Sequence, residues 1–176
     1  SRFAPEQIRL ASWGLEEYSP NFDKHLSDVN FHDAGDLELP LGNTYKSLDV
    51  IEQNVEEIYH DGKKVFGIGG EHLVTLPEIK AVSKFYKDLA IVHFDAHTDL
   101  REEYLGEEMS HSAVIRHASK IVGAQNLKQI GIRSGMKEEF NFMREHHTLA
   151  KTYSDLDSLK DKKIFVTVDL DVLDPS

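Results

Sequence analysis

The sequence predicts an α/β fold, a three-layer α/β/α sandwich with a mostly parallel central sheet. Three observations support this class. Helical and strand patterns alternate along the 176 residues, several strands are near-continuous apolar runs, and acidic residues follow the strands. Such alternation favours a parallel sheet with helices on both faces. Ligands of these sheets bind beyond the carboxyl ends of the strands.

Composition narrows the function classes. The length suits one domain, residues 1–176. The absence of Cys excludes disulfides, thiolate zinc sites and cysteine catalysis. Twenty basic against 31 acidic residues give a net charge of −11, which argues against nucleic-acid and anionic-membrane partners and suits cationic ones. No apolar run approaches the roughly 20 residues of a membrane span, and no signal-peptide pattern is seen, so we expect a cytoplasmic protein.

The first half of the chain predicts two helices and two short strands. The helix over 45–60 has the clearest periodicity, with Leu48, Ile51 and Val55 at spacings of three and four. A helix over 5–18 is expected to turn Ile8 and Leu15 inward. The expected strands cover 29–33 and 64–68.

The second half contains the stronger patterns. Residues 89–94 form a near-continuous apolar strand, typical of a sheet covered on both faces. The other expected elements are helices over 75–86, 112–122 and 137–146, strands over 127–132 and 163–168, a polar loop over 99–110 and a small strand or turn over 148–153.

Two acidic clusters follow the strongest strands. In the segment Asp95-Ala96-His97-Thr98-Asp99, an extended backbone would point the two Asp and the His the same way. Asp169 and Asp171 alternate in the same manner after the last strand. Parallel strands deliver their carboxyl ends to one edge, so we expect the clusters to meet. Asp174, before a Pro, is expected to be structural or to support a ligand.

A third segment, residues 67–72, ends in Gly69-Gly70-Glu71-His72. Glycines there permit a tight turn that presents His72 at the same edge. The segment lacks the patterns of phosphate-binding loops. Glu71 is expected to hydrogen-bond locally or to support a ligand. Four carboxylates and two imidazoles exceed the needs of one catalytic ion and suit two ions with a shared hydrolytic water. The predicted ligands are His72, Asp95, His97, Asp99, Asp169 and Asp171.

The sequence supports two roles for His111 equally well. Its pKa range suits a general acid–base or proton shuttle near the metals. Alternatively, it is a surface His beside a helix-capping Ser110. The hypothesis of a catalytic Ser–His–Asp triad built on Ser110 or Ser112 is weak, because the sequence has no GxSxG motif. His93, inside an apolar strand, is expected to be a hydrogen-bonded core His that supports the site.

The motifs at 69–72, 95–99, 110–112 and 169–175 resemble, in order and spacing, those of the ureohydrolase (arginase/agmatinase) family. Segments 1–9 and 131–133 resemble two others. The resemblance implies two Mn²⁺ ions per chain, one held by His72, Asp95, Asp99 and Asp169 and the other by Asp95, His97, Asp169 and Asp171. A metal-bridging hydroxide would attack the guanidinium carbon. His111 matches the family's proton-transfer His.

The likeness is strongest to bacterial-type agmatinases, which implies hydrolysis of agmatine to putrescine and urea in polyamine biosynthesis. It also implies a trimer or hexamer. The family has a strand before Ser1, and a Gly- and Pro-rich loop and a catalytic Glu after Ser176, so we expect a partial domain. The alternatives are an arginase, guanidinobutyrase or other guanidino hydrolase, a one-zinc deacetylase-type hydrolase, and a non-catalytic metal-binding fragment.

Overall fold

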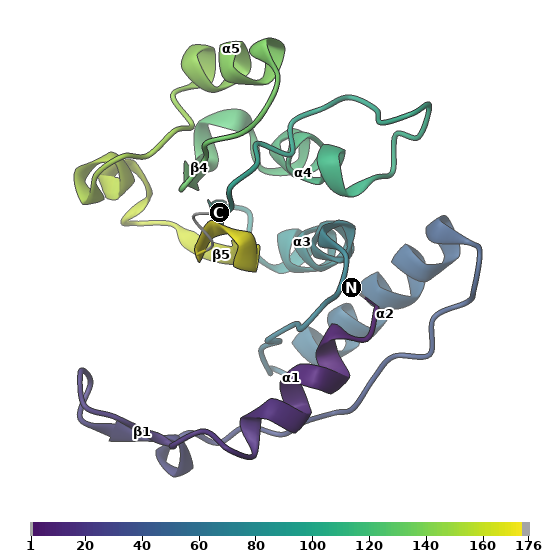
Figure 1. Ribbon diagram of the computed structural model, residues 1–176, viewed down its shortest axis with the longest axis vertical. Coiled ribbons are helices and arrows are strands. Elements are labelled where there is room, and N and C mark those ends of the chain that lie inside the picture. Colours follow the sequence, from purple (N-terminus) through teal and green to yellow (C-terminus); the bar gives the residue numbers. More distant parts are fainter. Residues whose placement is uncertain (1, 174–176) are drawn as a thin grey trace.

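Three parallel strands form the central sheet, in the order β4-β3-β5 (Figure 1). The computed structural model describes residues 2–173. Strand β3 (Leu89–Phe94) lies in the middle and pairs in parallel with β4 (Leu127–Ile130) and β5 (Lys163–Val168). The predicted α/β class with a parallel sheet is thereby confirmed.

Helices cover one face of this sheet. They are α2 (Thr44–His60), α3 (Thr75–Phe85), α4 (Val114–Val122) and α5 (Lys137–His146). Helix α2 packs on α3, α3 packs on α4, and α4 contacts β3. Their apolar side chains form one core with the sheet, and its fully buried members include Leu76, Ile79, Ile91, Val114, Ile115 and Leu127.

Strand β3 contributes to both faces, which explains its near-continuous apolar sequence. Leu89 and Ile91 enter the helix-covered core, whereas Ala90 and Val92 pack with Leu159 on the other side. In the described part of the chain, this other face of the sheet is covered by the 3₁₀ segment η5 (Tyr153–Leu159) and not by an α-helix. None of the helices within residues 2–173 is both long enough and apolar enough for a membrane span.

The N-terminal predictions were partly wrong. Helix α1 (Ala4–Ser12) ends six residues early, ahead of Gly14; it buries none of its residues, so Ile8 is exposed, as is Leu15 beyond its end. A hairpin follows, in which β1 (Tyr18–Ser19) pairs with β2 (Lys24–His25), each strand having two residues. Figure 1 shows it away from the sheet. A 3₁₀ turn, η1 (Leu26–Asp28), comes next, and residues 29–33 form no strand.

Other boundaries shift for local reasons. Residues 64–68 form no strand because they find no pairing partner in the described chain, and Phe66 is 90% exposed. Strand β4 ends at Ile130 because Gly131 adopts a φ of +91°. Two 3₁₀ turns, η3 (His111–Ala113) and η4 (Ala124–Asn126), flank α4. The predicted segment 148–153 contributes one isolated bridge, Gln129 with Leu149.

Candidate metal centre

The acidic clusters meet because the strand pairing continues past the strand ends. The backbone N–H of Asp95 donates to the carbonyl of Ile130 at 3.1 Å, and that of Asp169 donates to the carbonyl of Phe94 at 2.8 Å. Asp95 and Asp169 therefore leave neighbouring parallel strands at the same level. This places both carboxylates at the carboxyl edge of the sheet, where the sequence predicted a site.

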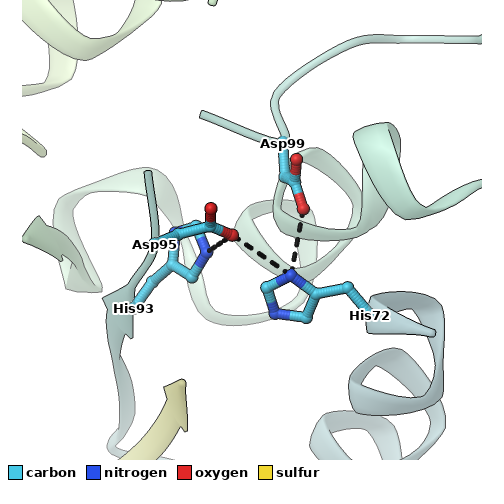
Figure 2. Close-up of side chains that lie close together, drawn as sticks. All are labelled: His72, His93, Asp95 and Asp99. Atoms are coloured by element: carbon cyan, nitrogen blue, oxygen red, sulfur yellow. Dashed lines mark hydrogen bonds and ion pairs between the residues drawn. The ribbon is translucent and has the colours of Figure 1, made fainter. Parts of the chain in front are cut away.

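His72 faces three carboxylates. It opens the 3₁₀ turn η2 (His72–Val74). Its Nδ1 lies 3.0 Å from Oδ2 of Asp99, 3.2 Å from Oδ2 of Asp95 and 3.7 Å from Oδ2 of Asp169. Figure 2 shows the first two contacts converging on this nitrogen. Its Nε2 contacts the hydroxyl of Thr167 at 3.0 Å. The three carboxylates come from two strand ends and one loop.

The Nδ1 atom of His72 is buried and makes no hydrogen bond, although carboxylate oxygens surround it. If Nε2 donates to Thr167, Nδ1 presents a lone pair to those oxygens. A cation bound between them satisfies all of these lone pairs at once. Among the described residues, this buried nitrogen without a hydrogen bond is the observation that supports a metal ion at the site.

Asp95 connects this group to a second one. Nδ1 of His97 lies 2.8 Å from Oδ2 of Asp171 and 3.5 Å from Oδ1 of Asp95. Ligand-type atoms thus form two overlapping groups that share Asp95. Asp95 is 1% exposed, whereas the side chain of His97 is 55% exposed. The first group consists of His72, His93, Asp95 and Asp99, and the second of Asp95, His97 and Asp171.

Asp169 lies beside both groups, although it belongs to neither. Its Oδ1 accepts a hydrogen bond from the backbone N–H of Asp171 at 3.0 Å. We predicted an extended backbone here, and this was wrong, because Leu170–Leu173 form the 3₁₀ turn η6. The turn brings Oδ1 of Asp171 to the N–H of Ala96 at 3.0 Å. Asp174 lies outside the described residues.

Asp99 is held by a strained backbone. The extended conformation predicted for 95–99 does not persist, because Asp99 adopts a φ of +49°. Left-handed backbone costs free energy at a non-Gly residue and persists only where neighbours enforce it. The carbonyl of Asp99 accepts from Ile115 and Arg116 at the start of α4. The next N–H, of Leu100, donates to the buried Oε1 of Glu139 at 3.0 Å.

Glu139, Arg133 and Gly131 have positioning roles that sequence reasoning missed. Glu139 also accepts from the N–H of Met136 at 2.7 Å, so one carboxylate bridges the start of α5 and the Asp99 loop. Arg133 donates to the carbonyl of Asp171 at 2.7 Å. A side chain on Gly131 would collide with Val172. A Glu three residues into a helix is a capping signal that pointed to Glu139.

A cavity of about 560 Å³ opens over both groups, and His111 lies on its wall. Nδ1 of His111 is 3.8 Å from Oε1 of Glu71, and its ring lies edge-on to Tyr104 at 5.6 Å. Glu71 also accepts from the N–H of Leu73, the local bond that we expected. The capping alternative for Ser110 is wrong, because its hydroxyl makes no capping bond and contacts Ser112.

The charges of the cluster shift its pKa values. Burial lowers the pKa of His72, but contacts with Asp95 and Asp99 outweigh burial and raise it to about 10, so the ring is protonated unless a cation takes the place of the proton on Nδ1. Burial raises the pKa of Asp95, yet the close contact with His72 and the hydrogen bond from His93 hold it far below its usual range. Asp95 is therefore ionised. The four Asp of the site have a formal charge of −4, which two divalent cations would balance.

Comparison with known proteins places the chain among relatives. The family model described as "Arginase family" matches residues 1–176. The chain is 52% identical to the agmatinase of Bacillus subtilis (strain 168), covering all of this chain and 63% of that protein. It is 33% identical to the N(1)-aminopropylagmatine ureohydrolase of Thermococcus kodakarensis, covering all of this chain and 62% of that protein.

A solved structure shows the same fold. The agmatine ureohydrolase of Thermoplasma volcanium superposes with a TM-score of 0.82 at 29% identity, covering 96% of this chain and 60% of that one. The chain spans about 63% of the length of the most similar curated relatives. The whole-chain family match, the identity to the Bacillus subtilis protein and this superposition show that the chain belongs to the arginase family.

Proposed function

We propose that the protein is a binuclear manganese amidinohydrolase that cleaves the guanidinium group of agmatine to putrescine and urea. The observation that carries this proposal is the pair of His/Asp groups sharing Asp95, in a chain 52% identical to an agmatinase. Carboxylate oxygens with imidazole nitrogens suit Mn²⁺. Asp95 and Asp169 would contribute ligand atoms to both ions. One ion is assigned to His72, Asp95, Asp99 and Asp169, and the other to Asp95, His97, Asp169 and Asp171.

Two divalent cations, when bound, lower the pKa of water toward neutrality and so supply a hydrolytic nucleophile. The chain's own residues hold the ligands and move the proton. His111 is the catalytic acid: Nδ1 lies beside Glu71, which leaves Nε2 to pass a proton to the departing amine. The ionised carboxylates also favour a cationic substrate at the cavity floor.

Agmatine is the proposed substrate because the most similar relatives include agmatinases. The competing substrates are arginine, guanidinobutyrate and N(1)-aminopropylagmatine, the last because a 33% identical relative is named for it. The test is urea release from these four compounds by the Mn²⁺-loaded protein. We expect agmatine to have the highest kcat/KM. Equal or faster hydrolysis of arginine would overturn the assignment.

A matched variant tests the role of His111. His111→Asn removes the proton donor but leaves the proposed ligands in place. We expect urea release to fall by roughly 100-fold, the usual contribution of a general acid, with Mn²⁺ stoichiometry unchanged. Unchanged urea release would contradict the role.

We also propose a cytoplasmic homo-oligomer, a trimer or hexamer. Exposed apolar side chains support association, including Trp13 at 85% and Phe22 at 77%. Sedimentation equilibrium on the full-length protein measures the state, and a monomer at micromolar concentration would contradict it.

A further inference from the structure

Three buried polar side chains form a chain of hydrogen bonds that ends at Asp95. His93 lies in β3, Gln129 lies beside it in β4, and Thr148 follows α5; each is 0% exposed. Buried polar groups cost free energy unless their hydrogen bonds are satisfied. The bonds among these three therefore determine which atom donates and which accepts.

The neighbours of Gln129 fix the orientation of its amide. The carbonyl oxygen of Thr98 can only accept, and it lies 2.8 Å from Nε2 of Gln129, so this atom is the amide nitrogen. The hydroxyl of Thr148 donates to Oε1 on the other side at 3.0 Å. The second N–H of the amide is directed to Nδ1 of His93, 3.1 Å away.

This orientation determines where His93 carries its proton. Because Nδ1 accepts from Gln129, the neutral ring holds its proton on Nε2. Nε2 lies 2.9 Å from Oδ2 of Asp95 and donates to it, a contact drawn in Figure 2. Both ring nitrogens are thus engaged, so neither offers a lone pair to a cation, although His93 lies within the first group.

We propose that His93, held by Gln129 and Thr148 with its proton on Nε2, is a positioning residue that fixes the Asp95 carboxylate between two metal ions. The assignment of the ions as Mn²⁺ rests on the proposed function. The other oxygen of Asp95, Oδ1, accepts from the backbone N–H of His97 at 2.6 Å. Each oxygen therefore keeps one lone pair, Oδ2 toward His72 and Oδ1 toward the ring of His97.

The partners that orient a metal ligand affect affinity strongly. Losing one commonly weakens metal binding by about 10–100-fold. His93→Leu removes the donor to Asp95, whereas His93→Gln keeps an N–H at similar reach. Thr148→Val is nearly isosteric and removes only the hydroxyl that orients Gln129. These three variants separate the loss of a hydrogen bond from the loss of a ligand.

The experiment measures Mn²⁺ affinity and stoichiometry by calorimetry, with thermal unfolding as a check on folding. We expect His93→Leu to bind Mn²⁺ about 10–100-fold more weakly and His93→Gln to recover most of that loss. Unchanged affinity in a folded His93→Leu protein would overturn the proposal. Loss of one Mn²⁺ equivalent in both His93 variants would also overturn it, because it would make His93 a ligand.

A second readout needs no metal. The ¹⁵N chemical shifts of an imidazole distinguish its two neutral tautomers. In the metal-free protein we expect the His93 signals to report a proton on Nε2, with a mixture of tautomers in Thr148→Val. A proton on Nδ1 would overturn the proposal, and this test remains if His93→Leu does not fold.

Urea release from agmatine separates the two proposals. Weakened Mn²⁺ binding in His93→Leu, together with no urea from the unaltered full-length protein, supports the positioning role and refutes the substrate. Normal hydrolysis with unchanged Mn²⁺ affinity in that variant refutes the positioning role alone.

Discussion

Glu78 on α3 provides a sharp test of the electrostatics of the fold. Burial raises the pKa of its carboxyl from an ordinary 4.5 to about 7. The carboxyl packs against the backbone of Gly67, so closely that a side chain there would collide with it. A shift of about 2.5 pKa units corresponds to about 3 kcal/mol, at 1.36 kcal/mol per unit.

The sign of the effect follows from proton binding. Between pH 4.5 and pH 7 the folded protein retains the Glu78 proton that the unfolded chain has already lost. The free energy of unfolding must therefore fall as the pH rises through this window. Above pH 7 the ionised carboxyl costs about 3 kcal/mol, and below pH 4.5 it costs nothing.

The variant Glu78→Gln removes this titration while keeping the shape of the side chain. We expect its stability relative to the unaltered protein to increase by about 3 kcal/mol between pH 4.5 and pH 8. Urea unfolding across this range measures it, with the exposed Glu57→Gln on α2 as the matched control. Parallel stability curves for Glu78→Gln and the unaltered protein would refute the reasoning.

Three further predictions concern the candidate centre. His97→Ala should remove one Mn²⁺ equivalent and most urea production, and unchanged stoichiometry by elemental analysis would contradict the ligand assignment. Glu139→Gln should weaken Mn²⁺ binding about 10-fold with little change in helix content, because an amide group cannot accept hydrogen bonds on both sides from Leu100 and Met136. Equal Mn²⁺ affinity by calorimetry would argue against a positioning role for Glu139. Gly131→Ala should destabilise the protein by about 1–3 kcal/mol, since its φ of +91° is unfavourable for Ala; an unchanged denaturation midpoint would show that the turn relaxes.

The central elements could be predicted because their patterns are local and strong. The boundaries of β3, β5 and α5 were predicted correctly, since apolar runs and helical periodicity depend on neighbouring residues alone. The segments 29–33 and 64–68 were also predicted to be strands, but they lack a pairing strand among the described residues. Strand formation depends on such a partner, and no local pattern supplies it.

The candidate ligands were easier to find than the residues that orient them. Both acidic motifs follow strands directly, so topology alone brings Asp95 near Asp169. Gln129 and Thr148, in contrast, are ordinary polar residues in sequence, and only the register of β4 against β3 places Gln129 beside His93. The turn at Leu170–Leu173 was missed because alternating acidic and apolar residues favour an extended reading.

The carboxylate of Asp95, common to both groups, has a consequence for how the centre fills. Two sites that share a ligand cannot titrate independently. The first ion neutralises part of the charge that would attract the second, so we expect loading in two steps of decreasing affinity. The half-loaded protein is then a distinct species, and in the proposed enzyme the supply of the second ion sets the fraction that is fully loaded.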